Sequence, residues 1–267
     1  MTETGDRMLG TSRMLEGRTA LVTGSGRGIG AAIARGLAQH GADVAINCLR
    51  DTESAQQVVA DVETAGGRGI MITADVTDSA AAARLVEATR EQLGPVDIVV
   101  HNALAGFQFD PRGRRAAWDL SVEDYTAQLN AAVGAAHAVT QAALPDLTGH
   151  GRGRVVSVLS DLIERPGVPY PEYVTAKSAL LGWSRSMSAE LGPLGVTVNC
   201  VAPGLVPSTG AASGTDDHLR DSLEAVTPLR RLAEPEDVAG AVLAFASDWL
   251  GFVTGACLFV DGGLVMR

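Results

Sequence analysis

The segment TGSGRGIG, Thr23 to Gly30, lies between a short apolar run and a stretch rich in alanine. Glycines at a strand-to-helix junction let the backbone approach phosphate groups closely, because no Cβ stands in the way. The amides and dipole at the start of the helix then attract negative charge. The segment therefore predicts a dinucleotide-binding turn whose cofactor-binding residues are Gly24, Ser25, Arg27, Gly28, Ile29 and Gly30.

The rest of the chain repeats this alternation of short apolar runs with alanine-rich helical stretches. The pattern is typical of βαβ units, whose right-handed crossovers place helices on both faces of a parallel sheet. We predict an α/β fold, a single-domain Rossmann-type doubly wound parallel sheet of about seven strands. The expected strands are Thr19–Thr23, Asp43–Asn47, Gly69–Thr73, Asp97–Val100, Arg154–Leu159, Val196–Asn199 and Cys257–Val260.

Two segments fall outside this pattern. Residues 1–13 are polar and lack the apolar run of a signal peptide or membrane span, so we expect a flexible tail before a single domain over residues 14–267. Residues 205–225 are rich in turn-forming residues and follow a predicted strand end, where ligands of such sheets bind. We expect a lid there, and a plain surface loop is the alternative.

Composition limits the classes of partner. The chain has 267 residues, of which 46% are hydrophobic, as in a globular domain. Its formal charge of −10 argues against general attraction to nucleic acid or to an anionic membrane. Cys48, Cys200 and Cys257 show no metal-ligand spacing and cannot all pair with one another, so we expect no metal site and a cytoplasmic location.

The choice of cofactor depends on the end of the second strand, where an acidic residue would bind the ribose 2′-hydroxyl of NAD. Asn47 is expected at that place. Arg27 and Arg50 can pair with a 2′-phosphate, although Asp51 adjoins Arg50 and a solvated loop charge is the alternative interpretation. The sequence therefore favours NADP(H) over NAD(H).

Tyr173 and Lys177 are four residues apart, so on a helix they share one face. A phenol titrates near pH 10 and needs a nearby cation to act at neutral pH, which Lys177 can supply. Such pairs also occur on solvated helix faces. Here, however, Ser160 ends the preceding predicted strand, where its hydroxyl can polarise the same substrate oxygen, whereas Ser157 lies within that strand and is expected to be structural.

From about Leu15 to Gly263, these segments resemble the classical short-chain dehydrogenase/reductase family. The glycines match its TGxxxGxG motif, and NCVAPGLVPS, which begins at Asn199, resembles its Pro-Gly turn. The resemblance implies catalytic roles for Asn130, Ser160, Tyr173 and Lys177, with Asn130 holding a water that connects the lysine to solvent. It also implies cofactor contacts from Asp75, Val76, Asn102, Ala103, Pro203, Gly204, Val206 and Ser208, with Thr209 as the alternative to Ser208.

One segment departs from the family pattern. HNALAG, which begins at His101, replaces the usual Asn-Asn-Ala-Gly, and Leu104 adds bulk near the expected cofactor. We expect His101 to be a strand-end residue rather than a base, because Tyr173 already fills that role.

The chain looks most like bacterial 3-oxoacyl-ACP reductases and carbonyl reductases of this family. The resemblance implies an NADP(H)-dependent enzyme that reduces a small or acyl-carrier-linked ketone, with Tyr173 donating the proton. The same residues can oxidise a secondary alcohol, and a dinucleotide-binding regulator without turnover is a third possibility. Relatives also imply a homotetramer.

Overall fold

The chain folds around a parallel sheet, and the computed structural model describes residues 13–104, 106–212 and 214–266. The strands are β1 (Thr19–Val22), β2 (Asp43–Cys48), β3 (Gly69–Thr73), β4 (Ile98–His101), β5 (Arg154–Val158), β6 (Thr197–Pro203) and β7 (Cys257–Val260). They lie in the order β3-β2-β1-β4-β5-β6-β7, and each neighbouring pair is parallel. The predicted Rossmann-type fold is confirmed.

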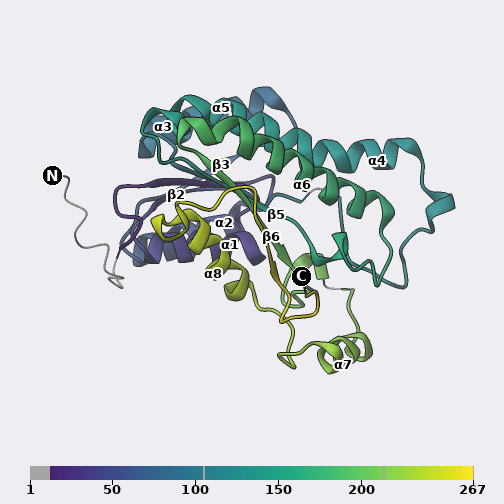
Figure 1. Ribbon diagram of the computed structural model, residues 1–267. Helices are drawn as coiled ribbons and strands as arrows, with labels where there is room; N and C mark the ends of the chain where they lie inside the picture. Colours follow the sequence, from purple (N-terminus) through teal and green to yellow (C-terminus); the bar gives the residue numbers. More distant parts are fainter. Residues whose placement is uncertain (1–12, 105, 213, 267) are drawn as a thin grey trace.

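Helices cover both faces of the sheet (Figure 1). One layer holds α1 (Gly28–Gln39), α2 (Thr52–Thr64) and α8 (Pro235–Ala246), and the other holds α3 (Ser79–Leu93), α4 (Val122–Leu129), α5 (Ala135–Gly149) and α6 (Pro171–Leu191). Each layer buries an aliphatic core, around Leu37 and Ile46 in the first and around Leu85 and Leu147 in the second. Because both faces are covered, a ligand is left with the ends of the strands.

Burial explains the continuous apolar runs of the sequence. The strands β1, β4, β5 and β6 are buried at every position, as expected for strands covered on both faces. At the sheet edge, β7 is more open, and its Leu258 is 44% exposed.

Strand β6 runs past its predicted end at Asn199 and continues to Pro203. Its added residues are buried and stay paired with β7, so that Pro203 lies opposite Val260. The extension carries Pro203 and Gly204 to the carboxyl edge of the sheet, where the glycine turn also lies.

The second half of the expected lid is helical, as α7 spans Asp217–Val226. Asp216 begins this helix, since its side chain accepts a hydrogen bond from the Leu219 amide at 2.8 Å. Leu219 and Leu223 lie one turn apart on α7, which projects beyond the sheet in Figure 1. This corrects the expectation of an irregular segment, because Pro, Gly and most turn-forming residues lie before Asp216. The role as a lid stays a prediction.

Residues 1–12 of the expected N-terminal tail lie outside the described residues. In the part of the chain that the structure describes, no helix combines the length and the apolar character needed to span a membrane. The same described residues contain no group of three or more His, Cys, Asp or Glu side chains that could hold a metal ion.

Candidate active site

A cavity of about 870 Å³, here called the main cavity, opens at the carboxyl ends of the strands. Its walls come from the glycine turn, the end of β2, the residues after β5 and β6, and the helices α6 and α7. The structure thus brings together most of the residues predicted from the sequence. Those that line the main cavity are Gly24, Arg27, Gly28, Ile29, Gly30, Arg50, Asn102, Ser160, Tyr173, Lys177, Pro203, Gly204 and Val206.

The glycine turn has the shape that a phosphate cradle needs. Gly24 has a φ of +62°, and a Cβ there would lie 2.8 Å from the Ala103 Cα. A Cβ on Gly30 would lie 2.5 Å from the Gly24 carbonyl oxygen. Helix α1 begins at Gly28 without a side-chain cap and without an acidic residue in its first turn. Its amino end is therefore suited to a pyrophosphate, as the glycine motif predicts.

A Gly30→Ala variant is expected to lose at least about tenfold in NADPH affinity and about 1–3 kcal/mol of stability, because its methyl group forces the turn apart. The matched control is Gly36→Ala in the same helix, whose Cβ would meet its nearest neighbour, the Ala239 Cβ, at 3.8 Å. Fluorescence titration with NADPH and thermal unfolding measure both effects. Wild-type affinity in Gly30→Ala would refute the tight fit.

Two residues predicted to bind the cofactor are instead structural. Ser25 is fully buried, and its hydroxyl donates to the Val22 carbonyl at 2.7 Å. Asn47 is also buried, and its Oδ1 accepts from the Gly24 amide at 3.1 Å while its Nδ2 donates to the Ala74 carbonyl at 3.1 Å. Neither lines the main cavity. The expected contacts of Ser25 and Asn47 are therefore corrected, since both fix the glycine turn from behind.

Cys48, rather than Asn47, faces the main cavity at the end of β2. Successive side chains of a strand point to opposite sides, so a shift of one residue changes which side chain meets the ligand. The adjacent main-cavity residues include Arg50 and Asp51. Asp51 caps α2, with its Oδ1 accepting from the Ser54 amide at 3.1 Å, and these hydrogen bonds with Ser54, helped by the charge of Arg27, lower its pKa. Cys48 and Asp51 thus line the main cavity together with Arg27 and Arg50.

The expected adenine contacts are not brought to the main cavity. Asp75 is exposed, and its Oδ1 accepts from the Thr77 hydroxyl at 2.7 Å and from the Thr77 amide at 3.0 Å. Val76 is buried and lines a separate small cavity. These placements leave the predicted roles of Asp75 and Val76 without a contact in the main cavity.

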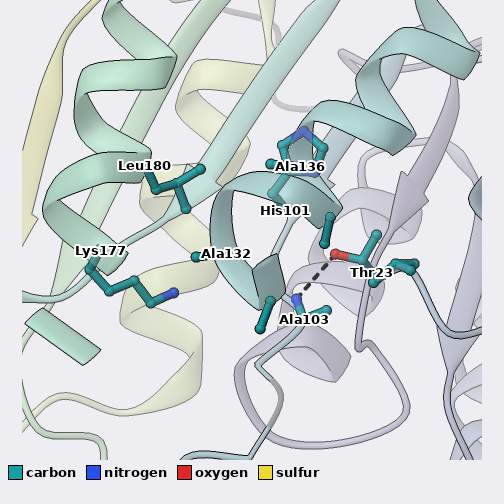
Figure 2. Close-up of a pocket in the computed structure, with 10 residues that line it drawn as sticks. Thr23, His101, Ala103, Ala132, Ala136, Lys177 and Leu180 are labelled. Carbon is teal, nitrogen blue, oxygen red and sulfur yellow. Dashed lines mark hydrogen bonds between the residues drawn. The ribbon is translucent and has the colours of Figure 1, made fainter. Parts of the chain in front are cut away.

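Thr23 clamps the segment after β4 to the glycine turn. Its Oγ1 accepts from the amides of Asn102 and Ala103 at 3.0 and 3.1 Å, the latter drawn in Figure 2. The Asn102 side chain donates to the carbonyl oxygens of Thr23 and Gly24 at 3.0 and 2.9 Å. Asn102 thereby reaches the main cavity, whereas Ala103 lines the small cavity.

After β6, Val206 is buried and Thr209 lines the main cavity. Thr209 Oγ1 donates to the Val206 carbonyl at 2.9 Å. Ser208 is exposed and donates instead to Glu234 Oε2 at 3.4 Å. The structure therefore favours Thr209 over Ser208 as the side chain that meets a cofactor.

Ser160, Tyr173 and Lys177 lie together in the wall of the main cavity, and all three are buried. Burial raises the pKa of Tyr173 well above its usual value, although a hydrogen bond with the Ser160 side chain opposes the shift. Burial lowers the pKa of Lys177 to about 8, and its Nζ donates to the Val158 carbonyl at 2.7 Å. At neutral pH this arrangement holds a protonated phenol beside a cation. Ser157 accepts from Ser184 at 3.2 Å, in keeping with its structural role.

Phe107 covers the phenol. Its ring stacks on that of Tyr173, with the centroids 3.8 Å apart and the planes inclined by 14°. Tyr170 packs edge-on against Phe107 at 5.1 Å. These contacts remove water from the Tyr173 ring, and no sequence motif pointed to Phe107.

Asn130 lies at the start of a π-helical turn and is not among the residues that line either cavity. A π-helical turn, Asn130–Gly134, follows α4, and the Asn130 side chain is exposed. Ala132 instead lines the small cavity with Lys177, which reaches toward it in Figure 2. That cavity offers about 10 Å³, about the space for one water molecule. The water-holding role expected of Asn130 stays a prediction.

His101 ends β4 and also borders the small cavity. Its Nε2 lies 2.8 Å from the Thr140 Oγ1, and its ring meets Trp183 edge-on at 5.8 Å. Burial lowers the pKa of His101 to about 3, so the imidazole is neutral at physiological pH. This agrees with the expectation of a strand-end residue.

Asp161, which follows Ser160, is a main-cavity residue that sequence reasoning missed. It is 6% exposed, and burial, together with the charge of Asp261, raises its pKa to about 7. A carboxyl whose folded-state pKa is raised destabilises the fold once it ionises.

An Asp161→Asn variant is therefore expected to gain stability over the wild type as pH rises from 5 to 8, by up to about 3 kcal/mol. In the unfolded chain Asp161 ionises near its usual pKa, so the penalty builds up between that value and about 7 and is absent in strong acid. Denaturant unfolding at pH 5 and pH 8 measures the difference in free energy of unfolding between the variant and the wild type, with Glu164→Gln as the control. A difference that does not vary with pH would contradict the buried carboxyl.

Known proteins share this fold and chain length. Residues 24–265 match the family model described as Enoyl-(Acyl carrier protein) reductase. The chain is 36% identical to L-rhamnose 1-dehydrogenase (NAD(P)(+)) of Sphingomonas, over 96% of this chain and 99% of the relative. It is 33% identical to the 3-oxoacyl-[acyl-carrier-protein] reductase FabG of Escherichia coli, over 94% of this chain and 98% of the relative.

A solved structure is similar to this chain in both sequence and fold. The short chain dehydrogenase of Burkholderia cenocepacia, in complex with NADP, matches with a TM-score of 0.83 and 38% identity, over 94% of this chain and 99% of that one. The family match and these relatives each cover nearly the whole chain. The chain therefore belongs to the classical short-chain dehydrogenase/reductase family of oxidoreductases.

Proposed function

We propose that this chain binds NADP(H) and interconverts a ketone and a secondary alcohol. The observation that carries the proposal is the burial of Ser160, Tyr173 and Lys177 together in a cavity that the glycine turn also lines. A regulator that only binds a dinucleotide has no use for a serine and a tyrosine aimed at one point.

A bound nicotinamide supplies the hydride in the reducing direction. The hydroxyls of Ser160 and Tyr173 hold the carbonyl oxygen and stabilise the negative charge that develops on it. Tyr173 donates its proton to that oxygen as a general acid. Lys177, fixed by the Val158 carbonyl, stabilises the phenolate that remains and helps to bind the nicotinamide ribose. In the oxidising direction the same groups act in reverse.

The preference for NADP(H) is supported by charge at the end of β2. Arg27 and Arg50 both line the main cavity, and Cys48 stands where a carboxylate would repel a 2′-phosphate. The relative from Burkholderia binds NADP, whereas the Sphingomonas relative is named for both dinucleotides.

Two classes of compound are candidates for the substrate. The Escherichia coli relative is named for 3-oxoacyl groups on acyl carrier protein, which suggests a 3-oxoacyl thioester or related ketone. The Sphingomonas relative is named as a sugar dehydrogenase, and the buried Asp161 beside Ser160 favours this second, alcohol-oxidising candidate.

Oxidation of NADPH and NADH by the purified chain, with acetoacetyl thioesters, a bicyclic ketone and an aryl ketone, tests the proposal. We expect NADPH to be used with at least one ketone, at roughly tenfold or higher kcat/KM than NADH. Turnover of thioesters alone identifies an oxoacyl reductase. If no ketone or alcohol is turned over although NADPH binds, the regulator hypothesis replaces this one.

We further propose a cytoplasmic homotetramer. The edge strand β7 exposes Leu258, and Trp249 and Phe252 nearby in the sequence are also exposed, as expected for a face that another copy covers. Light scattering after gel filtration should give four times the chain mass of 27.5 kDa. The mass of a single chain would contradict the assembly.

A further inference from the structure

The structure assigns to Asp161 the recognition of a second hydroxyl group on the substrate, carried by the carbon next to the reacting one. The inference rests on the proposed function, because it takes Ser160 and Tyr173 as the groups that hold the reacting oxygen. It narrows the substrate to a vicinal diol in one direction and an α-hydroxy ketone in the other.

The position of Asp161 follows from the turn after β5. Ser160 begins a 3₁₀ turn, Asp161–Ile163, by accepting a hydrogen bond from the Leu162 amide at 3.3 Å. The Ser160 hydroxyl lies 3.4 Å from the Asp161 Oδ1, so the carboxyl is adjacent to the group that polarises the substrate. Neighbouring oxygens of one substrate can therefore meet Ser160 and Asp161 together.

The other face of Asp161 is fixed by the turn after β6. A Cβ built on Gly204 would lie 3.7 Å from the Asp161 Oδ2 and 3.1 Å from the Asp261 Cβ. Asp261 accepts from the amides of Gly263 and Val265 at 3.0 and 2.8 Å, so both of its oxygens already have partners. Asp161 has the Ser160 hydroxyl beside its Oδ1 and the Gly204 turn near its Oδ2, and its carboxyl group can accept a further hydrogen bond from a ligand in the main cavity.

The main cavity also has apolar lining residues. These include Leu162, Val168, Leu205, Leu219 and Leu264. A buried carboxyl among such side chains is costly unless a hydrogen-bond donor meets it. The Ser160 hydroxyl is one such donor, 3.4 Å from the Asp161 Oδ1, and the expected further donor is a hydroxyl of the substrate.

A hydroxyl fits this place better than an ammonium group. Asp161 loses its charge near neutral pH, and a protonated carboxyl can still exchange hydrogen bonds with a hydroxyl but not pair with a cation. Lys177 and Arg165 also line the main cavity, and both would repel a second cation.

The test compares oxidation of cyclohexanol, trans-1,2-cyclohexanediol and trans-2-aminocyclohexanol with NADP⁺ by the full chain. We expect kcat/KM for the diol to exceed that for cyclohexanol by roughly 10- to 100-fold. Asp161→Leu should reduce this ratio to about one, and Asp161→Asn should give an intermediate ratio. A general loss of activity or stability cancels in the ratio, so the comparison stands even if a variant is less active.

The matched control is Glu164→Leu, which removes a carboxylate at the end of the same turn but outside the lining of the main cavity, and should leave the ratio unchanged. Equal loss of both alcohols in the Asp161 variants would overturn the inference and make Asp161 a positioning residue for Ser160. A preference for the amino alcohol that Asp161→Asn abolishes would also overturn it. If the wild type oxidises none of the probes and reduces no ketone, the proposed function fails first.

Discussion

A Tyr173→Phe variant is expected to lose at least about 10³-fold in kcat/KM for ketone reduction while it binds NADPH with nearly wild-type affinity. The change removes one hydroxyl and leaves the ring to stack on Phe107, 3.8 Å away. Because burial raises the pKa of Tyr173 above its usual value, its phenol holds the proton that the developing alkoxide needs at neutral pH. Lys177 is a poor substitute, since its Nζ is held by the Val158 carbonyl at 2.7 Å.

NADPH oxidation at saturating ketone measures the loss, and fluorescence titration measures cofactor binding. The matched control is Tyr170→Phe, which removes another buried phenol hydroxyl from the same aromatic cluster but outside the lining of the main cavity. It should keep most of the activity. If Tyr173→Phe retains more than about a tenth of wild-type kcat/KM, another group donates the proton and the proposed mechanism is wrong.

The fold could be predicted because its signal is spread over the whole chain. Seven apolar runs separated by helical stretches leave few arrangements, and the glycine turn fixes which end of the sheet binds a ligand. The serine, tyrosine and lysine could be predicted because their spacing brings them to one place whatever the details of packing. The helix α7 was missed because turn-forming residues precede it and hide a single capped helix.

The sequence could not predict in which direction an individual side chain points. Asn47 and Cys48 are neighbours in β2, and only the register of the strand decides that the cysteine faces the main cavity. Asn130 and Ala132 both lie in the π-helical turn Asn130–Gly134, which a helical spacing of 3.6 residues does not anticipate. The sequence did not indicate that Asp161 is buried in the main cavity, since an acidic residue after a strand is ordinarily solvated. Local backbone geometry decides each of these cases.

A Cys48→Asp variant is expected to lower the ratio of kcat/KM for NADPH to kcat/KM for NADH by roughly 100-fold or more. Cys48 is 5% exposed and lines the main cavity close to the glycine turn, where a Cβ on Gly26 would lie 3.5 Å from its Cβ. A carboxylate there faces the doubly charged 2′-phosphate of NADPH, and such a like-charge contact costs several kcal/mol. The same carboxylate can accept a hydrogen bond from the 2′-hydroxyl of NADH.

Steady-state kinetics with both cofactors and one ketone check this result. The control is Cys48→Asn, which has nearly the shape of aspartate without its charge, and which should keep the preference for NADPH. If kcat/KM for NADPH falls equally in both variants, the size of the side chain rather than its charge is responsible. An unchanged preference in Cys48→Asp would mean that the 2′-phosphate lies away from β2, and the roles proposed for Arg27 and Arg50 would fail with it, because both arginines are assigned to the same phosphate.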